Sequence, residues 1–167
     1  MDKSIYKDVF VFVEQRENKI QSVAKELIGK ARELADELGE KVVAVLLGHN
    51  IEAKAKELIP YGADLVLCVD DRELQTYITE PYTQAITQIV NERKPSIVLL
   101  GATTIGRDLG PRLSARLGTG LTADCTGLDI SEERELLMTR PAFGGNLMAT
   151  IVCKDHRPQM STVRPGV

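Results

Sequence analysis

The sequence predicts an α/β fold, a doubly wound three-layer sandwich with a mainly parallel sheet and a C-terminal antiparallel ribbon. Through the first two thirds of the chain, near-continuous apolar segments alternate with amphipathic helical segments. This alternation is typical of buried parallel strands joined by crossover helices. The last third changes to short polar and apolar segments separated by glycine turns, which favours antiparallel strands. With 167 residues, 43% of them hydrophobic, the chain suits one globular domain.

The individual elements follow from apolar spacing and from turn residues. Ser22 is expected to cap the first helix, and Gly39 to end it. Pro60 and Gly62 are expected to break the second helix. The predicted parallel strands are 8–14, 41–47, 64–69 and 96–100, the predicted helices are 23–38, 51–59, 79–93 and 107–117, and the predicted antiparallel strands are 135–139, 147–153 and 159–163.

Composition excludes several classes of function. The net charge is −3, from 21 basic and 24 acidic residues without a basic block, which argues against nucleic-acid binding. No apolar run approaches the roughly 20 residues that span a bilayer, and no signal peptide opens the chain, so no membrane association is expected. Cys68, Cys125 and Cys153 lie far apart, and there are two histidines. We therefore expect reduced thiols in a cytoplasmic protein and no metal site.

The segment 101–108 follows the fourth predicted strand and permits two interpretations. Its small residues, its hydroxyls and a helix N-terminus would suit an anion cradle at the carboxyl edge of the sheet. It is neither a P-loop nor a GxGxxG turn, however. The alternative is an ordinary helix start, with Thr104 as the cap and Asp108 paired with Arg112 four residues later.

No catalytic set is visible in the sequence. Ser114 lacks the glycine elbow of a nucleophile, and His49 and His156 read as surface residues. Asp124 and Cys125 could form a reactive pair, but without an evident basic neighbour core packing is favoured for the thiol. The residues alone indicate a binding or carrier domain without catalytic residues of its own.

The segment 140–146, with the sequence RPAFGGN, is the most distinctive part of the chain. Arg140 carries a permanent charge and can donate two parallel hydrogen bonds. Pro141 fixes the following backbone, and Gly144 and Gly145 permit positive φ or close approach of another molecule. The alternative is a hairpin turn whose arginine faces solvent.

Three long motifs resemble the α subunit of electron-transfer flavoproteins. They are GATTIGRDLGPRLSARLGTGLTADCT at 101–126, RPAFGGN at 140–146 and RPQMSTVRPGV at 157–167. The opening strand VFVFVEQ at 9–15 is similar as well, so the resemblance covers essentially the whole chain. It implies an adenine-nucleotide-hydrolase-like sandwich for residues 1–163, and in 164–167 the start of a linker to a C-terminal FAD-binding domain. That domain is absent from this sequence, which is expected to be a truncated or cleaved subunit that cannot bind the α-subunit FAD.

The resemblance also implies a partner and a shared site. The partner is the β subunit, which in this family holds either AMP or, in flavin-bifurcating members, a second FAD that reacts with NADH. We hypothesise that Arg140 reaches this β-subunit flavin across the interface, that Gly144 and Gly145 allow close approach, and that Phe143 and Asn146 pack on it or bond to it. For the loop 101–106 the resemblance implies an empty or vestigial nucleotide cleft.

The amino-acid sequence of the 140–146 motif is more similar to the anaerobic, bifurcating branch of this family than to the mitochondrial branch. This implies that the heterodimer passes electrons from NADH to an acyl-CoA dehydrogenase type partner and to ferredoxin or flavodoxin. NAD would bind through the β subunit. Three alternatives remain open at this point: a non-bifurcating flavoprotein with AMP in the β subunit, an adenine-nucleotide-binding stress-type domain, and a purely structural interaction domain.

Overall fold

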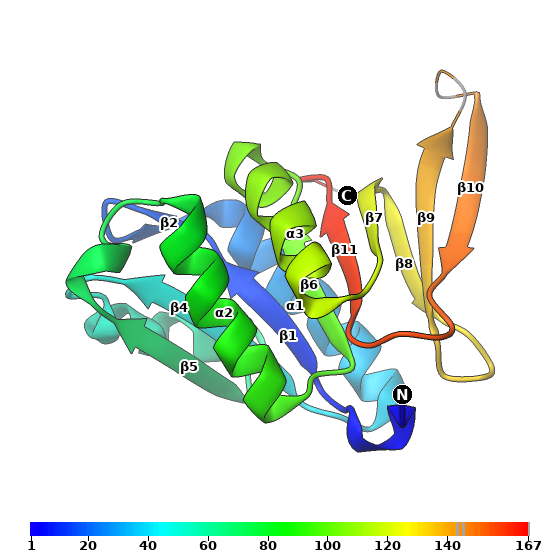
Figure 1. The fold of residues 1–167 in the computed structure, drawn as a ribbon, viewed down its shortest axis with the longest axis horizontal. Coiled ribbons are helices and arrows are strands. Elements are labelled where there is room, and N and C mark those ends of the chain that lie inside the picture. The colour runs from blue at the N-terminus through cyan, green and yellow to red at the C-terminus, as the bar shows by residue number, and fades with distance from the viewer. Residues whose placement is uncertain (143, 145, 167) are drawn as a thin grey trace.

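A computed structural model confirms the doubly wound α/β sandwich; it describes residues 1–142, 144 and 146–166. Within these residues the main sheet has six strands in the order β5-β4-β1-β6-β11-β7, and all neighbouring pairs are parallel (Figure 1). Its strands are β1 (Val9–Val13), β4 (Val42–Gly48), β5 (Leu65–Asp70), β6 (Ile97–Gly101), β7 (Leu121–Cys125) and β11 (Gln159–Val163). The helices that cover them are α1 (Ser22–Leu38), α2 (Thr79–Arg93) and α3 (Thr104–Leu117).

An antiparallel ribbon stands beside the main sheet, as the sequence predicted. Among the described residues it consists of three strands in the order β10-β9-β8 (Figure 1). The strands are β8 (Gly127–Ile130), β9 (Leu136–Ala142) and β10 (Leu147–Val152). A short hairpin of β2 (Gln15–Arg16) and β3 (Lys19–Ile20), which the sequence analysis missed, follows β1.

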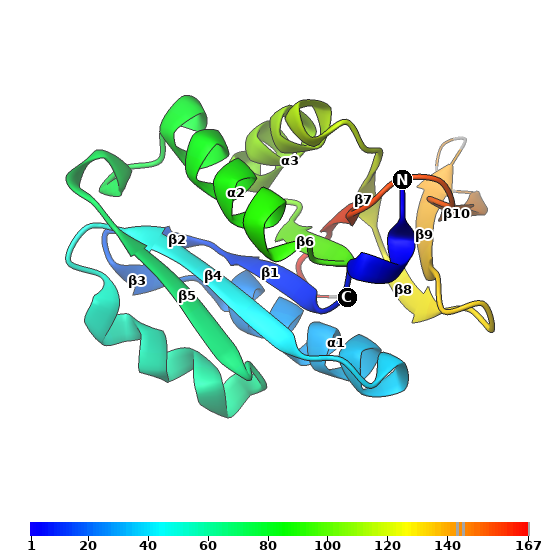
Figure 2. The same cartoon turned by 60° about the horizontal axis from the view of Figure 1, so that its bottom comes forward.

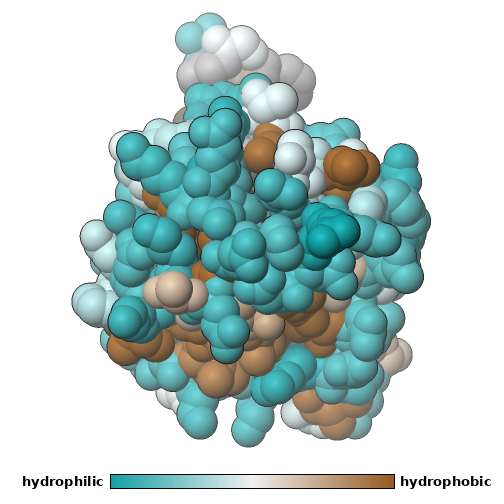
Figure 3. Space-filling view, turned by 90° about the vertical axis from the view of Figure 1, so that its left-hand side faces the viewer, coloured by the Kyte–Doolittle hydropathy of each residue, from teal (hydrophilic) through white to brown (hydrophobic). Residues whose placement is uncertain are grey.

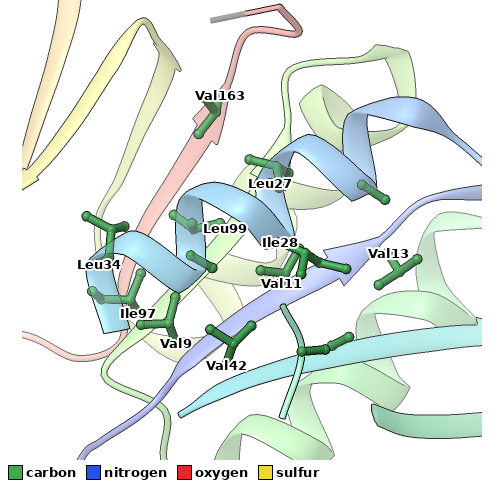
Figure 4. Close-up of a cluster of buried hydrophobic side chains, with 14 of the residues drawn as sticks. Val9, Val11, Val13, Leu27, Ile28, Leu34, Val42, Ile97, Leu99 and Val163 are labelled. Atoms are coloured by element: carbon green, nitrogen blue, oxygen red, sulfur yellow. The ribbon is translucent and has the colours of Figure 1, made fainter. Parts of the chain in front are cut away.

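The core has two parts, one on each face of the sheet. Figure 2 shows α1 on one side of the sheet and α2 and α3 on the other. Alternate residues of β1 point to opposite faces. Val9, Val11 and Val13 therefore pack with Leu27 and Ile28 of α1 (Figure 4). Phe10 and Phe12 belong to the second cluster, which includes Tyr82, Ile86, Leu109 and Leu113 of α2 and α3. Because both faces are covered, every residue of β1 is buried.

Several element ends differ from the sequence-based prediction. Gln21, not Ser22, is the N-cap residue of α1, while Gly39 ends the helix in the left-handed conformation as expected. The predicted second helix is a 3-10 helix, η2 (Glu52–Tyr61), with Pro60 inside its last turn. Pro60 therefore does not break the helix, which ends at Gly62 with φ +127. Two further 3-10 turns are η1 (Lys3–Ile5) and η3 (Arg72–Leu74).

The last third of the chain contains the largest error of the prediction. The segment 159–163 was expected to be antiparallel, but β11 is a parallel strand between β6 and β7. The polar residues of this segment suggested a strand with one exposed face, but all five residues are buried, as in a central strand. The polar groups have hydrogen-bond partners from other strands: the Gln159 side-chain oxygen accepts from the Leu136 N–H at 2.8 Å, and the Thr162 hydroxyl accepts from the Asp124 N–H at 2.9 Å. β7 was not predicted as a strand.

The described part of the chain also bears on membrane and metal binding. None of its helices has both the length and the apolar character needed to cross a membrane. Its histidine, cysteine and carboxylate side chains form no cluster of three or more that could hold a metal ion. The face shown in Figure 3 is mainly hydrophilic, with hydrophobic side chains gathered in the lower half of the view and a few more in the upper half.

The ion pair of Arg32 and Asp64 leads to a prediction about acid stability. Asp64 accepts from the Val42 N–H at 2.9 Å and from the Arg32 guanidinium at 2.7 Å, and these contacts lower the pKa of its carboxyl group. A carboxyl whose pKa is lowered in the folded state stabilises the fold above its unfolded pKa of about 3.9, and this stability is lost as the pH falls through the lower folded value. Asp64→Asn should therefore lower the melting temperature at pH 7 more than at pH 3. An equal loss at both values would contradict this role for the charge.

Candidate functional site

The segment around Arg140 lies at the free end of the antiparallel ribbon. Arg140 pairs with Ala149 of β10, and Pro141 pairs with Met148. β8 reaches only as far as Thr139 along β9, so Pro141 lies beyond the β8 ladder. Proline has no N–H to donate, and it is tolerated at this position because β8 no longer runs alongside β9 there. The end of the ribbon projects away from the body of the molecule (Figure 1).

The turn between β9 and β10 is described in part. Gly144 is exposed, has φ +74, and has nothing within 4 Å of the position that a Cβ would take. Its backbone is therefore accessible to another molecule, as the sequence analysis expected of it. Asn146 is also exposed. Phe143 and Gly145, the other two predicted site residues of this turn, lie outside the described residues.

Arg140 lies where the buried face of the ribbon ends. Alternate residues of a strand share a face, so Leu136, Met138 and Arg140 lie on the same side of β9. Leu136 and Met138 are buried in the core, whereas Arg140 is half-buried. Its Nε is inaccessible to solvent and has no hydrogen-bond partner among the described residues. A buried donor without a partner is unfavourable, so this position of Arg140 carries a cost in stability.

The charge of Arg140 acts on the pKa of Cys125, which lies at the end of β7. Burial raises the pKa of the Cys125 thiol, and the opposing effects of the Ser161 hydrogen bond and of the Arg140 charge are smaller. The expectation that no basic residue lies near this thiol was wrong, but core packing is confirmed, since Cys125 is fully buried. A thiol with a raised pKa is a poor nucleophile at neutral pH.

Asp124 marks the point at which the chain leaves the main sheet for the ribbon. It has φ +57, and the ladder of β7 with β11 shifts register at this point. Its Oδ1 lies 3.4 Å from Nε of Arg107 on α3. Only Thr126 separates β7 from β8, and its N–H donates to the Thr139 carbonyl at 2.8 Å. The N–H of Arg164, just after β11, donates to the Cys125 carbonyl at 3.0 Å.

The outer strand of the ribbon exposes apolar side chains. Leu147 and Met148 of β10 are 58% and 57% exposed, and Ile151 is 38% exposed. β10 pairs with β9 alone among the described residues, so its other backbone edge is available. An edge strand with apolar side chains is a surface that other chains bind. We call Leu147, Met148, Ile151 and the free edge of β10 the ribbon edge.

The loop after β6 is a capped helix start, but the capping residue was predicted one position too late. Thr103, not Thr104, is the N-cap of α3, and its hydroxyl accepts from the Gly106 N–H at 3.1 Å. Asp108 accepts hydrogen bonds from the hydroxyls of Tyr77 and Thr79 instead of pairing with Arg112. The guanidinium of Arg112 donates to Glu80 of α2 at 3.1 Å.

The isolated polar residues that were weighed as catalytic candidates have structural surroundings. The hydroxyl of Ser114 donates to the Pro111 carbonyl within α3 at 3.1 Å. Nδ1 of His49 lies 3.7 Å from Asp70, whose carboxylate accepts from backbone N–H groups that follow β4. His156 is exposed. The structure brings none of these residues together with Arg140.

Comparison with known proteins agrees with this architecture. The family model described as "Electron transfer flavoprotein domain" matches residues 9–167. The chain belongs to the electron transfer flavoprotein family. The predicted resemblance to the α subunit is confirmed, and the stress-type domain is set aside.

Similar proteins carry the names of electron-transfer subunits. The chain is 61% identical over 168 residues to the electron transfer flavoprotein subunit alpha of Clostridium acetobutylicum, covering 100% of this chain and 50% of that protein. It is 51% identical to the acryloyl-CoA reductase electron transfer subunit beta of Anaerotignum propionicum, covering 99% of this chain and 52% of that protein. It is 50% identical to the lactate dehydrogenase (NAD(+),ferredoxin) subunit LctC of Acetobacterium woodii, covering 98% and 39%. This electron transfer flavoprotein chain thus spans about half the length of the curated relatives that it matches.

Sequence reasoning missed two features of this region. The first is the ribbon edge, for which the signal was the pair Leu147-Met148 in a strand predicted to be antiparallel and therefore free to expose one face. The second is the contact of Arg107 with Asp124. This contact depends on how α3 lies over the end of β7, and no local pattern encodes that placement.

Proposed function

We propose that this chain is the base domain of an electron-transfer flavoprotein α subunit, whose ribbon edge packs on a β subunit and whose Arg140 contributes a cation to a flavin held there. The observation that carries the proposal is the position of half-buried Arg140 at the projecting end of the ribbon, beside the exposed turn residues Gly144 and Asn146 and the exposed apolar residues of β10. Family membership and the names of the relatives support a flavin and a second subunit.

The residues present fit the edge of a flavin ring. A guanidinium donates in a planar fork, which matches the carbonyl and ring-nitrogen acceptors of a flat heterocycle. Gly144 leaves space for close approach of the ring or of the loop that holds it. Exposed Asn146 offers a further donor and acceptor. Together with Phe143 and Gly145, these are the residues that we propose to contact the β-subunit FAD.

Arg140 would act by placing positive charge where negative charge develops. The flavin supplies the redox chemistry, and its reduced form carries more negative charge on the ring. A fixed cation in a partly desolvated site stabilises this charge more than solvent does. Arg140 is fixed by its place in a paired strand next to the core, so little reorganisation is needed.

Replacing Arg140 tests the proposal. In the assembled heterodimer, Arg140→Ala should lower the midpoint potential of the β-subunit flavin by about 30 mV, which for a two-electron couple is a tenfold change in equilibrium constant. Arg140→Lys should restore part of the shift, because lysine keeps the charge and loses the fork. Arg72→Ala, at an exposed arginine of η3, is the control. An unchanged potential in Arg140→Ala, with normal assembly, would favour a purely structural domain.

The finer proposal is that the heterodimer bifurcates electrons. NADH would be oxidised through the β subunit, and electrons would pass to an acyl-CoA dehydrogenase type partner and to ferredoxin or flavodoxin. The names of two relatives support this, since one is an acryloyl-CoA reductase subunit and the other a lactate dehydrogenase that uses NAD(+) and ferredoxin. Counting flavins from the visible spectrum of the complete heterodimer separates the proposals: two FAD favour bifurcation, and one FAD with bound AMP favours the non-bifurcating type.

A further inference from the structure

The winding of the main sheet creates a crevice between β1 and β6. These strands are neighbours, but the chain continues from β1 to α1 on one face and from β6 to α3 on the other (Figure 2). In open parallel sheets, ligands bind at such a switch point, outside the carboxyl ends of the two strands. α3 is a 14-residue helix whose N-terminus lies at this point, so its first N–H groups favour an anion there.

A carboxylate of this chain already spans the crevice. Glu14 directly follows β1 and is 4% exposed, which is unusual for a glutamate. Its Oε1 accepts a hydrogen bond from the hydroxyl of Thr103, the residue that caps α3. The guanidinium of Arg16 lies 3.5 Å from the other oxygen, Oε2. Glu14 and Thr103 therefore link the two sides of the switch point.

We infer that Glu14 is a built-in anion that fills the phosphate position of the switch-point crevice and excludes phosphate-bearing nucleotides from this chain. The inference rests on the sheet topology and on this contact, and it does not depend on the proposed flavin site. A phosphate brought to the same N-terminus would have to displace the carboxylate, or lie beside it as a like charge.

Gln15, the residue after Glu14, covers the neighbouring part of the carboxyl edge of the sheet, at the end of β4. Gln15 is 7% exposed, and its side-chain nitrogen donates to the Leu47 carbonyl of β4 at 3.1 Å. Its side-chain oxygen accepts from the Asn18 N–H at 3.0 Å. A cleft of about 610 Å³ lies next to Gln15, and its lining also includes Arg16, which contacts Glu14, and Ile105, in the first turn of α3. The cleft is large enough for a nucleoside, while the position for the attached phosphate is filled.

Backbone packing is close where α3 begins at the end of β6. A Cβ added at Gly106 would lie 1.7 Å from the Gly101 carbonyl oxygen, so the first turn of α3 rests directly on the end of β6. A Cβ at Gly101 would lie 2.8 Å from Val23 of α1. No anion can enter between the end of β6 and the first turn of α3, whereas the Glu14 carboxylate lies beside this junction, bonded to Thr103.

Two substitutions separate the effect of charge from the effect of size. Glu14→Gln keeps the side-chain volume and a hydrogen-bonding group but removes the charge, while Glu14→Ala also vacates the space. Glu17→Gln is the matched control, because Glu17 lines the same cleft but is exposed on the β2–β3 turn. Circular dichroism and thermal melting establish that each purified variant is folded.

Titration calorimetry with AMP, and with adenosine as the uncharged comparison, tests the inference. We expect the unmodified chain to bind AMP no better than adenosine. Glu14→Ala should gain about tenfold or more in AMP affinity, with Glu14→Gln gaining less and adenosine binding unchanged in both. Tight AMP binding by the unmodified chain would overturn the inference. So would folded Glu14→Gln and Glu14→Ala proteins that gain no more AMP affinity than Glu17→Gln.

Discussion

Leu147→Glu combined with Met148→Glu should weaken the association of this chain with its β subunit by about 100-fold, or nearly 3 kcal/mol. Both side chains are more than half exposed on the outer strand of the ribbon, so the isolated chain should keep its melting temperature. Buried in an interface, the two introduced carboxylates would lack partners, and burial of unpaired charge is strongly unfavourable. Analytical ultracentrifugation of the mixed subunits measures the effect.

Leu65→Glu provides the control for this prediction. Leu65 is 40% exposed on β5, at the opposite edge of the six-stranded sheet from β7 and the ribbon. The same kind of substitution there should leave association unchanged. If Leu65→Glu and the ribbon variant weaken assembly equally, or if neither does, the ribbon edge is not the docking surface.

Gly106→Ala should destabilise the fold by about 4 kcal/mol, among the larger effects of single substitutions. The added methyl group would lie 1.7 Å from the Gly101 oxygen and 2.9 Å from the Gly101 carbonyl carbon, and both atoms are backbone. No side-chain rotation relieves such a contact, so α3 would have to move away from β6. Urea unfolding followed by circular dichroism measures the change in the free energy of unfolding.

Gly29→Ala is the matched control, because Gly29 is also inside a helix. Nothing lies within 4 Å of its added Cβ, so the substitution should stabilise α1 by about 0.5–1 kcal/mol through helix propensity. Equal losses in the two variants would show that glycine in these helices is needed for a reason other than space.

The parallel half of the fold could be predicted because its strands are apolar on both faces. β1, β4 and β6 are almost continuous Val, Leu, Ile and Phe, and the helices between them show helical spacing. β11 was predicted as a strand but with the wrong pairing, because Gln159, Ser161 and Thr162 are polar and yet buried, as in a central strand. Their burial depends on partners such as the Asp124 and Leu136 N–H groups, which come from distant parts of the chain.

The site could be predicted only as a segment. The charge, the proline and the glycines of 140–146 marked it as unusual, and the structure places Arg140 in a strand at the margin of the core. The depth of its burial and its proximity to Cys125 depend on how β9 meets the end of β7, which sequence spacing does not reveal. The hydrogen bond between Glu14 and Thr103, which are 89 positions apart in the sequence, could not be predicted for the same reason.

The ribbon is joined to the main sheet through Thr126 and is also packed into the core, because Leu128 of β8 and Leu136 and Met138 of β9 belong to the same buried cluster as β1. The carbonyl of Cys125, just before this connection, accepts a hydrogen bond from the N–H of Arg164, where the chain leaves β11. The end of β7, the start of the ribbon and the end of β11 are therefore held together by backbone hydrogen bonds. A partner bound at the ribbon edge would thus meet a surface whose orientation relative to the main sheet is set by the fold before binding.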